Sequence, residues 1–115
     1  MSKYPLTNYL RTYRKRAGLT QDDVAHLLGC HTAGQVSRYE HFRREPSLRV
    51  ALAFEVIFNA SARLIFRGDF KQVEQSVTLR AKRMATRLAI HGQVAGKANR
   101  LASLRAIGAA RADQM

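Results

Sequence analysis

The stretch that decides the fold is RKRAGLTQDDVAHLLG, which occupies residues 14–29 of a 115-residue chain. Gly18 ends one helical pattern, and the Thr20 hydroxyl can accept a hydrogen bond from a backbone N–H at the start of the next helix. Asp22 and the aspartate after it suit the positive end of that second helix. Gly29 ends it after about nine residues. The stretch therefore predicts two short helices joined by a tight connection.

Further apolar patterns with helical spacing lie on both sides of this stretch. The predicted helices are Leu6–Arg14, the segment capped by Thr20, Ala33–Phe42, Leu48–Phe58 with Ser47 as N-cap, and Ala62–Phe66, closed by Gly68. An alternating pattern of period two, which would indicate a strand, is found nowhere in the sequence. We therefore predict an all-α domain of five helices over residues 1–67.

A longer apolar stripe begins beyond Gly68. Its members are Phe70, Val73, Val77, Ala81, Met84 and Leu88, and their spacing predicts a helix of about 20 residues that Gly92 ends. A second stripe starts at Val94 and runs through an Ala-rich, basic segment. These patterns predict a basic helical extension over residues 68–115. It could pack on the first domain, form a dimer interface, or lie on a membrane as an amphipathic helix.

The composition is strongly basic. Lys and Arg total 20 against 8 Asp and Glu, which gives a net charge of +12, with +6 on residues 1–67 and +6 on residues 68–115. Such a charge favours a polyanionic partner, most simply nucleic acid. One cysteine cannot form an intramolecular disulfide, and no apolar run is long enough to cross a membrane. Because a signal-peptide pattern is also missing, we expect a cytoplasmic protein associated with the bacterial nucleoid.

The order of motifs over residues 6–67 resembles the Xre/Cro-type repressor helix-turn-helix family. The resemblance is carried by Arg14-Lys15-Arg16-Ala17-Gly18-Leu19-Thr20-Gln21, by Val36-Ser37-Arg38-Tyr39-Glu40, by Arg44-x-Pro46-Ser47-Leu48 and by Leu64-Ile65-Phe66. The chain departs from the family at one point. Gly29 to Val36 spans seven positions, one more than the common spacing, so the turn before the third helix is lengthened.

This resemblance implies a Cro/repressor-like domain whose third helix enters the major groove of double-stranded DNA. The side chains then expected to face the DNA from this helix are Thr32, Gln35, Ser37, Arg38 and His41. Arg38 can bond bidentately to guanine, and Gln35 can read adenine or bridge to a phosphate.

Phosphate contacts are expected around that helix. The resemblance places one at Gln21, where the side chain and the N-terminal amides of the second helix meet the DNA backbone. Arg43, Arg44 and Arg49 follow the third helix and suit phosphate neutralisation. The resemblance also implies that Arg14 and Glu40 form a structural ion pair linking the first and third helices.

The sequence contains no catalytic constellation, phosphate loop or dinucleotide fingerprint, so we expect no enzymatic activity and no cofactor. His26, Cys30 and His31 are close in sequence and raise the question of a metal site. Gly29 breaks the helix between them and no fourth ligand follows at a regular spacing, so we expect no metal and interpret Cys30 as a small packed turn residue.

We predict a dimeric transcriptional repressor acting at a palindromic operator. One helix-turn-helix reads only a few base pairs, whereas two related by a two-fold axis read half-sites about 34 Å apart or a multiple of it. Residues 68–115 are the expected dimer interface or DNA-contact segment, since their basic residues Arg80, Lys82, Arg83, Arg87, Lys97 and Arg100 would stay exposed and could extend the DNA contact. Membrane binding is disfavoured because their stripe offers one aromatic residue. Two alternatives stay open. One is an antitoxin of this fold, which binds DNA and also a toxin protein; a co-regulator is the other possible protein partner. The second alternative is an architectural or RNA-binding basic protein.

Overall fold

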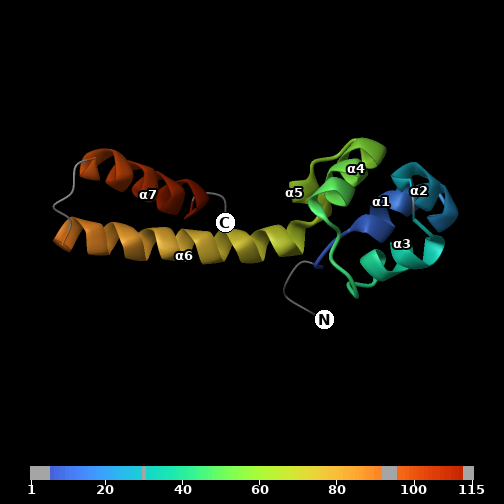
Figure 1. The fold of residues 1–115 in the computed structure, drawn as a ribbon, viewed down its shortest axis with the longest axis horizontal. Coiled ribbons are helices and arrows are strands. Elements are labelled where there is room, and N and C mark those ends of the chain that lie inside the picture. The colour runs from blue at the N-terminus through green and yellow to red at the C-terminus, as the bar shows by residue number, and fades with distance from the viewer. Residues whose placement is uncertain (1–5, 30, 92–95, 113–115) are drawn as a thin grey trace. The chain divides into compact units, whose positions relative to one another are not determined.

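The computed structural model describes residues 6–29, 31–91 and 96–112. Its helices are α1 (Leu10–Arg16), α2 (Gln21–Leu28), α3 (Ala33–Glu40), α4 (Leu48–Phe58), α5 (Ala62–Ile65), α6 (Arg67–His91) and α7 (Lys97–Ala112), and the described residues contain no strand (Figure 1). The predicted all-α class is confirmed. The chain divides into two compact units, Met1–Phe70 and Lys71–Met115, so α6 begins in the first and continues through the second.

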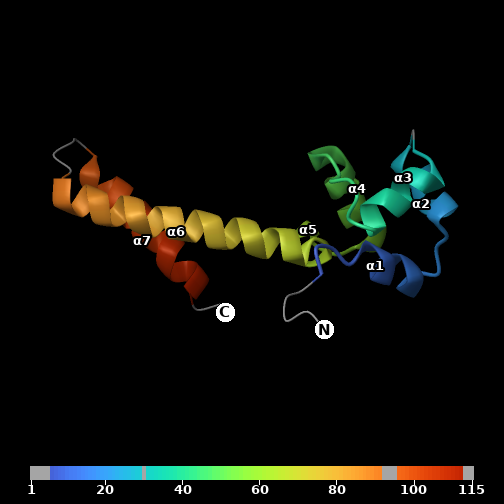
Figure 2. The same ribbon diagram turned by 90° about the horizontal axis from the view of Figure 1, so that it is seen from below.

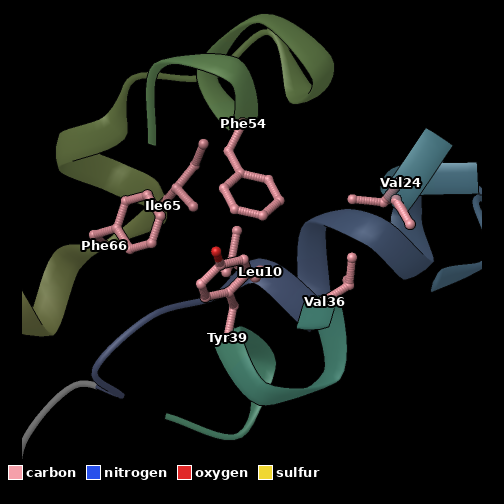
Figure 3. Close-up of a cluster of buried hydrophobic side chains, with 8 residues drawn as sticks. Leu10, Val24, Val36, Tyr39, Phe54, Ile65 and Phe66 are labelled. Carbon is pink, nitrogen blue, oxygen red and sulfur yellow. The ribbon is translucent and has the colours of Figure 1, made fainter. Parts of the chain in front are cut away.

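The first unit has one hydrophobic core to which each of its five helices contributes (Figure 3). The fully buried side chains of this core are Leu10, Val24, Val36, Phe54 and Ile65, one from each of α1 to α5. Phe54 lies among other aromatic rings. It forms a T-shaped pair with Tyr39, with a centroid distance of 6.1 Å and an interplanar angle of 88°, a favoured arrangement for aromatic pairs. The core therefore ties α3 directly to α4.

Four helices of this unit are preceded by a residue whose side-chain hydroxyl accepts a hydrogen bond from the backbone N–H three positions further on. These N-caps are Thr20 for α2, Thr32 for α3, Ser47 for α4 and Ser61 for α5. At the start of α2 the bond is reciprocal, because the Thr20 N–H donates to the Asp23 carboxylate over 2.8 Å. The start of each helix is thus defined by local chemistry that the sequence already contains.

We expect Thr20→Ala to destabilise the first unit by about 1 kcal/mol, because the first turn of α2 loses its cap. The two hydrogen bonds from Thr20 lower the pKa of Asp23. A carboxyl group whose pKa is lower in the folded than in the unfolded state stabilises the fold at pH values above its unfolded-state pKa. This stabilisation is lost as the pH falls through the folded-state pKa, so the cap weakens in acid. Urea unfolding of wild type and variant at neutral and acidic pH measures both effects. Ser47→Ala is the control, since the Ser47 hydroxyl caps α4 and the first turn of that helix contains no acidic residue; an equal acid sensitivity of both variants would contradict this account.

The structure corrects three details of the sequence analysis. Leu27 and Leu48, whose apolar side chains and helical positions would favour burial, are 54% and 75% exposed. Gly68 does not close the fifth helix: α5 ends at Ile65, and Gly68 lies in the first turn of α6. A Cβ at Gly68 would collide with the backbone of the N-terminal segment, 2.7 Å from Thr7 Cα. The glycine is needed for this close approach.

The second unit is a helical hairpin in which α7 lies alongside α6 (Figures 1 and 2). Ala81, Ala85 and Gly108 are buried, and the Lys82 side chain lies against Gly108. A groove of about 770 Å³ runs between the helices, lined in part by Lys82, Thr86, Ile90, Leu104 and Arg105. Of the predicted stripe on α6, Val73, Val77 and Met84 remain 44–60% exposed. Gly92 and Val94, which we expected to mark the turn and the next helix, lie outside the described residues.

Candidate nucleic-acid interface

Helices α2 and α3 pack against each other, α2 also packs on α4, and α3 on α1. One side of α3 is buried through Val36, Tyr39 and Glu40. The opposite side, which carries Gly34, Arg38 and His41, is exposed. This arrangement presents the length of α3 to solvent on a rigid support, as a recognition helix requires.

The connection between α2 and α3 is four residues long, and its conformation places the start of α3. Gly29 has a φ of 96°, and the His31 N–H donates to the Gly29 carbonyl over 2.6 Å. Thr32 then caps α3, which begins at Ala33 as predicted and ends at Glu40, two residues earlier than predicted. Cys30, which we interpreted as a packed turn residue, lies outside the described part of the chain.

Thr32 and Gln35 form a reciprocal capping box at the first turn of α3. The Thr32 N–H donates to Gln35 Oε1 over 2.7 Å, and the Gln35 N–H donates to Thr32 Oγ1 over 3.2 Å. Bidentate reading of adenine needs both the oxygen and the nitrogen of a glutamine amide. With its oxygen engaged in the cap, Gln35 retains its amide N–H groups, which suit a phosphate or a single base acceptor.

Gln21 belongs to a partly buried polar network that joins three helices. Its Nε2 donates to Glu40 Oε1 over 3.2 Å. Arg14 donates to the same carboxylate from Nε over 2.6 Å and from Nη2 over 3.2 Å, and from Nη1 to the Leu19 carbonyl. The hydrogen bond to Glu40 raises the pKa of Arg14. The predicted ion pair between the first and third helices is confirmed, and the network holds Gln21 at the N-terminus of α2.

Ser37 and Arg38 lie in the second half of α3, and His41 is the C-cap residue that follows it. Arg38 is exposed, and His41 Nδ1 lies 2.8 Å from the Ser37 carbonyl oxygen and 3.3 Å from the Ser37 hydroxyl. A carbonyl oxygen only accepts hydrogen bonds, so Nδ1 carries a proton and Nε2 of the neutral ring can accept one. This face therefore offers a guanidinium donor beside an imidazole acceptor, a pair able to distinguish the edges of base pairs.

Arg43 and Arg44 are exposed in the loop that follows α3. This loop begins with a Schellman-type ending, in which the Arg43 N–H donates to the Arg38 carbonyl and the Phe42 N–H to the Tyr39 carbonyl. The residue in the left-handed conformation is Phe42, with a φ of 62° and a side chain that is 47% exposed. Glycine usually occupies such a position. Nothing in the residue type or spacing of Phe42 marks this conformation in the sequence.

The electrostatic character of this face is positive. Arg14 is paired with Glu40, whereas the exposed Arg38, Arg43 and Arg44 form no salt bridge with any residue in the described part of the chain. The same residue ranges contain no group of three His, Cys, Asp or Glu side chains placed to hold a metal ion. An anionic ligand would therefore meet uncompensated arginines around α3.

A recognition helix held against a second short helix, with arginines at and beyond its end, defines a helix-turn-helix domain, a DNA-binding unit. Residues 5–65 match the family described as the helix-turn-helix domain, and the chain belongs to this family, in its Xre/Cro-like form. No curated protein and no solved structure matched the chain. None of the described helices combines the length and the apolar character that a membrane span requires.

Proposed function

We propose that the protein binds double-stranded DNA sequence-specifically, as a dimeric transcriptional repressor at a palindromic operator. The observation that carries the proposal is the exposed face of α3, where Arg38 and His41 project from a helix whose opposite side is buried. Gln21, Arg43 and Arg44 flank this face and suit phosphate contacts that orient the domain. Thr32, Gln35 and Ser37 complete the proposed contact set.

The experiment that tests this function is selection of bound duplexes from a random pool by the full chain. Specific binding is expected to enrich one motif with two inverted halves, spaced by about one helical turn or a multiple of it. Equal recovery of all sequences would instead support the architectural or RNA-binding alternative, because such a protein discriminates little between sequences.

Dimerisation is proposed for the extension, residues 68–115. The exposed Val73, Val77 and Met84 on α6 support it, since these apolar side chains have no cover in the single chain. A second copy bound at this stripe would cover them and place two recognition helices on one duplex.

We expect a chain ending at Phe70 to be a monomer that has lost most of its operator affinity. The cut leaves the first unit whole, including the hydrogen bond from the Asp69 N–H to the Thr7 carbonyl. Light scattering gives the mass of both forms, and circular dichroism checks that the shortened chain is folded. An unchanged dimer would contradict the assignment. If the full-length chain is itself a monomer, the exposed Val73, Val77 and Met84 remain available to another protein, as the antitoxin and co-regulator alternatives require.

A further inference from the structure

Residues 71–115 carry a large excess of basic over acidic side chains. Residues 71–115 contain nine Lys and Arg against two Asp and Glu, a net charge of +7. Three of the arginines, Arg80, Arg83 and Arg87, are exposed on α6. Their spacing of three and four residues places them on one face of the helix, where like charges repel one another. We call these three residues the arginine stripe.

The arginine stripe lies on the side of α6 that faces away from α7. The buried residues Ala81 and Ala85 mark the covered side of the helix, and a Cβ added at Gly108 would lie 3.0 Å from Lys82 Cγ. On a helix of 3.6 residues per turn, the arginine stripe is centred roughly opposite Ala81 and Ala85. The hairpin therefore neither buries nor neutralises the three guanidinium groups.

We propose that the arginine stripe binds the phosphate backbone of duplex DNA, adding a sequence-independent contact to that of α3. The inference rests on the proposed function insofar as DNA is taken as the partner of the first unit. The three arginines extend over about 10 Å of helix axis. Duplex DNA carries about six phosphate charges over the same length. Guanidinium groups suit this partner, because each can bond a phosphate with two parallel N–H donors.

Two other polyanionic partners fit residues 71–115 less well. Residues 71–115 contain no Phe, Tyr or Trp. Proteins that bind single strands stack the bases on aromatic side chains, and helices that lie on membranes anchor themselves with bulky apolar and aromatic residues opposite their charges. The side of α6 opposite the arginine stripe is already covered, with Ala81 and Ala85 buried. A duplex backbone requires neither aromatic stacking nor a free apolar face.

The test compares two triple variants of the full chain on a random-sequence duplex over a range of salt concentrations. Arg80→Gln, Arg83→Gln and Arg87→Gln together remove the arginine stripe. The matched control is Lys97→Gln, Arg100→Gln and Arg105→Gln, which removes the same charge from α7 of the same unit. Circular dichroism shows whether both variants keep their helix content.

Loss of the arginine stripe is expected to weaken duplex binding at least about tenfold at moderate salt. The slope of log affinity against log salt should fall by about 2.7, that is 0.9 for each lost phosphate contact, while the control changes it by less than about 1. Equal losses in the two variants would overturn the proposal, because only total charge would then matter.

Two further probes decide between polyanions. A single strand of the same sequence and a vesicle containing phosphatidylserine are titrated with wild type and both variants. The proposal is overturned if the arginine stripe contributes as much to binding of either probe as to the duplex. The outcome is separate from that of the proposed function. A wild-type chain without sequence preference whose salt slope still depends on the arginine stripe would refute specific recognition by α3 and leave this inference standing.

Discussion

Replacing Glu40 by Ala is expected to lower the free energy of unfolding by about 3–5 kcal/mol, because it leaves a charged partner without its counter-ion in the protein interior. The Glu40 side chain is 1% exposed and that of Arg14 is 13% exposed. Three donor groups converge on this carboxylate, two from Arg14 and one from Gln21. Unfolding in urea, followed by circular dichroism, measures the loss.

A double variant separates the ion pair from the packing around it. Arg14→Met with Glu40→Leu removes both charges and keeps most of the volume, so it should recover most of the stability lost in Glu40→Ala. A loss below about 1 kcal/mol in the single variant would contradict this account, because that is the size of a solvent-exposed ion pair. The raised pKa of Arg14 keeps its guanidinium charged as the pH rises, since the stabilisation from this shift is lost only when the pH passes through the folded-state value.

Arg38→Ala is expected to cost about 1–3 kcal/mol of operator binding, roughly a 5- to 150-fold loss, and to relax the preference at one base pair of each half-site. The reason is the exposure of this guanidinium on the outward side of α3, where it can bond bidentately to a base edge. Fluorescence anisotropy with an operator and with a random duplex measures the difference between specific and non-specific binding.

Arg43→Ala provides the matched control for this prediction. Arg43 is an equally exposed arginine, but it lies in the loop beyond α3. Its loss should weaken the operator and the random duplex alike and reduce the salt slope by about 1, as for a phosphate contact. If Arg38→Ala behaves in the same way as Arg43→Ala, Arg38 contacts only the DNA backbone.

The sequence predicts best those helices whose first and last residues are set by residues next to them in the sequence. The bounds of α4, Leu48–Phe58, are as predicted, because the Ser47 cap and the left-handed Asn59 are local signals. The role of Gly68 could not be predicted in this way. It depends on the approach of the backbone at Leu6 and Thr7, residues some sixty positions away that the fold brings to α6.

The candidate site also contains some contacts that the sequence predicts and others that depend on how the helices pack. The Arg14–Glu40 pair followed from the family resemblance, and the structure confirms it. The hydrogen bond from Gln21 to Glu40 and the use of the Gln35 oxygen in the cap of α3 did not follow. A sequence shows that a polar residue lies on a helix, but the competing partners within the protein become visible only when the helices are packed together.

The most direct test of the central claim, that α3 reads base pairs, is selection from a random duplex pool carried out in parallel with the wild-type chain and with Arg38→Ala. The account predicts an inverted repeat for the wild-type chain. For the variant, it predicts the same repeat with the preference lost at one base pair of each half and retained elsewhere. Recovery of identical motifs by both chains would contradict the role of Arg38, and no enrichment by the wild-type chain would contradict sequence-specific binding itself.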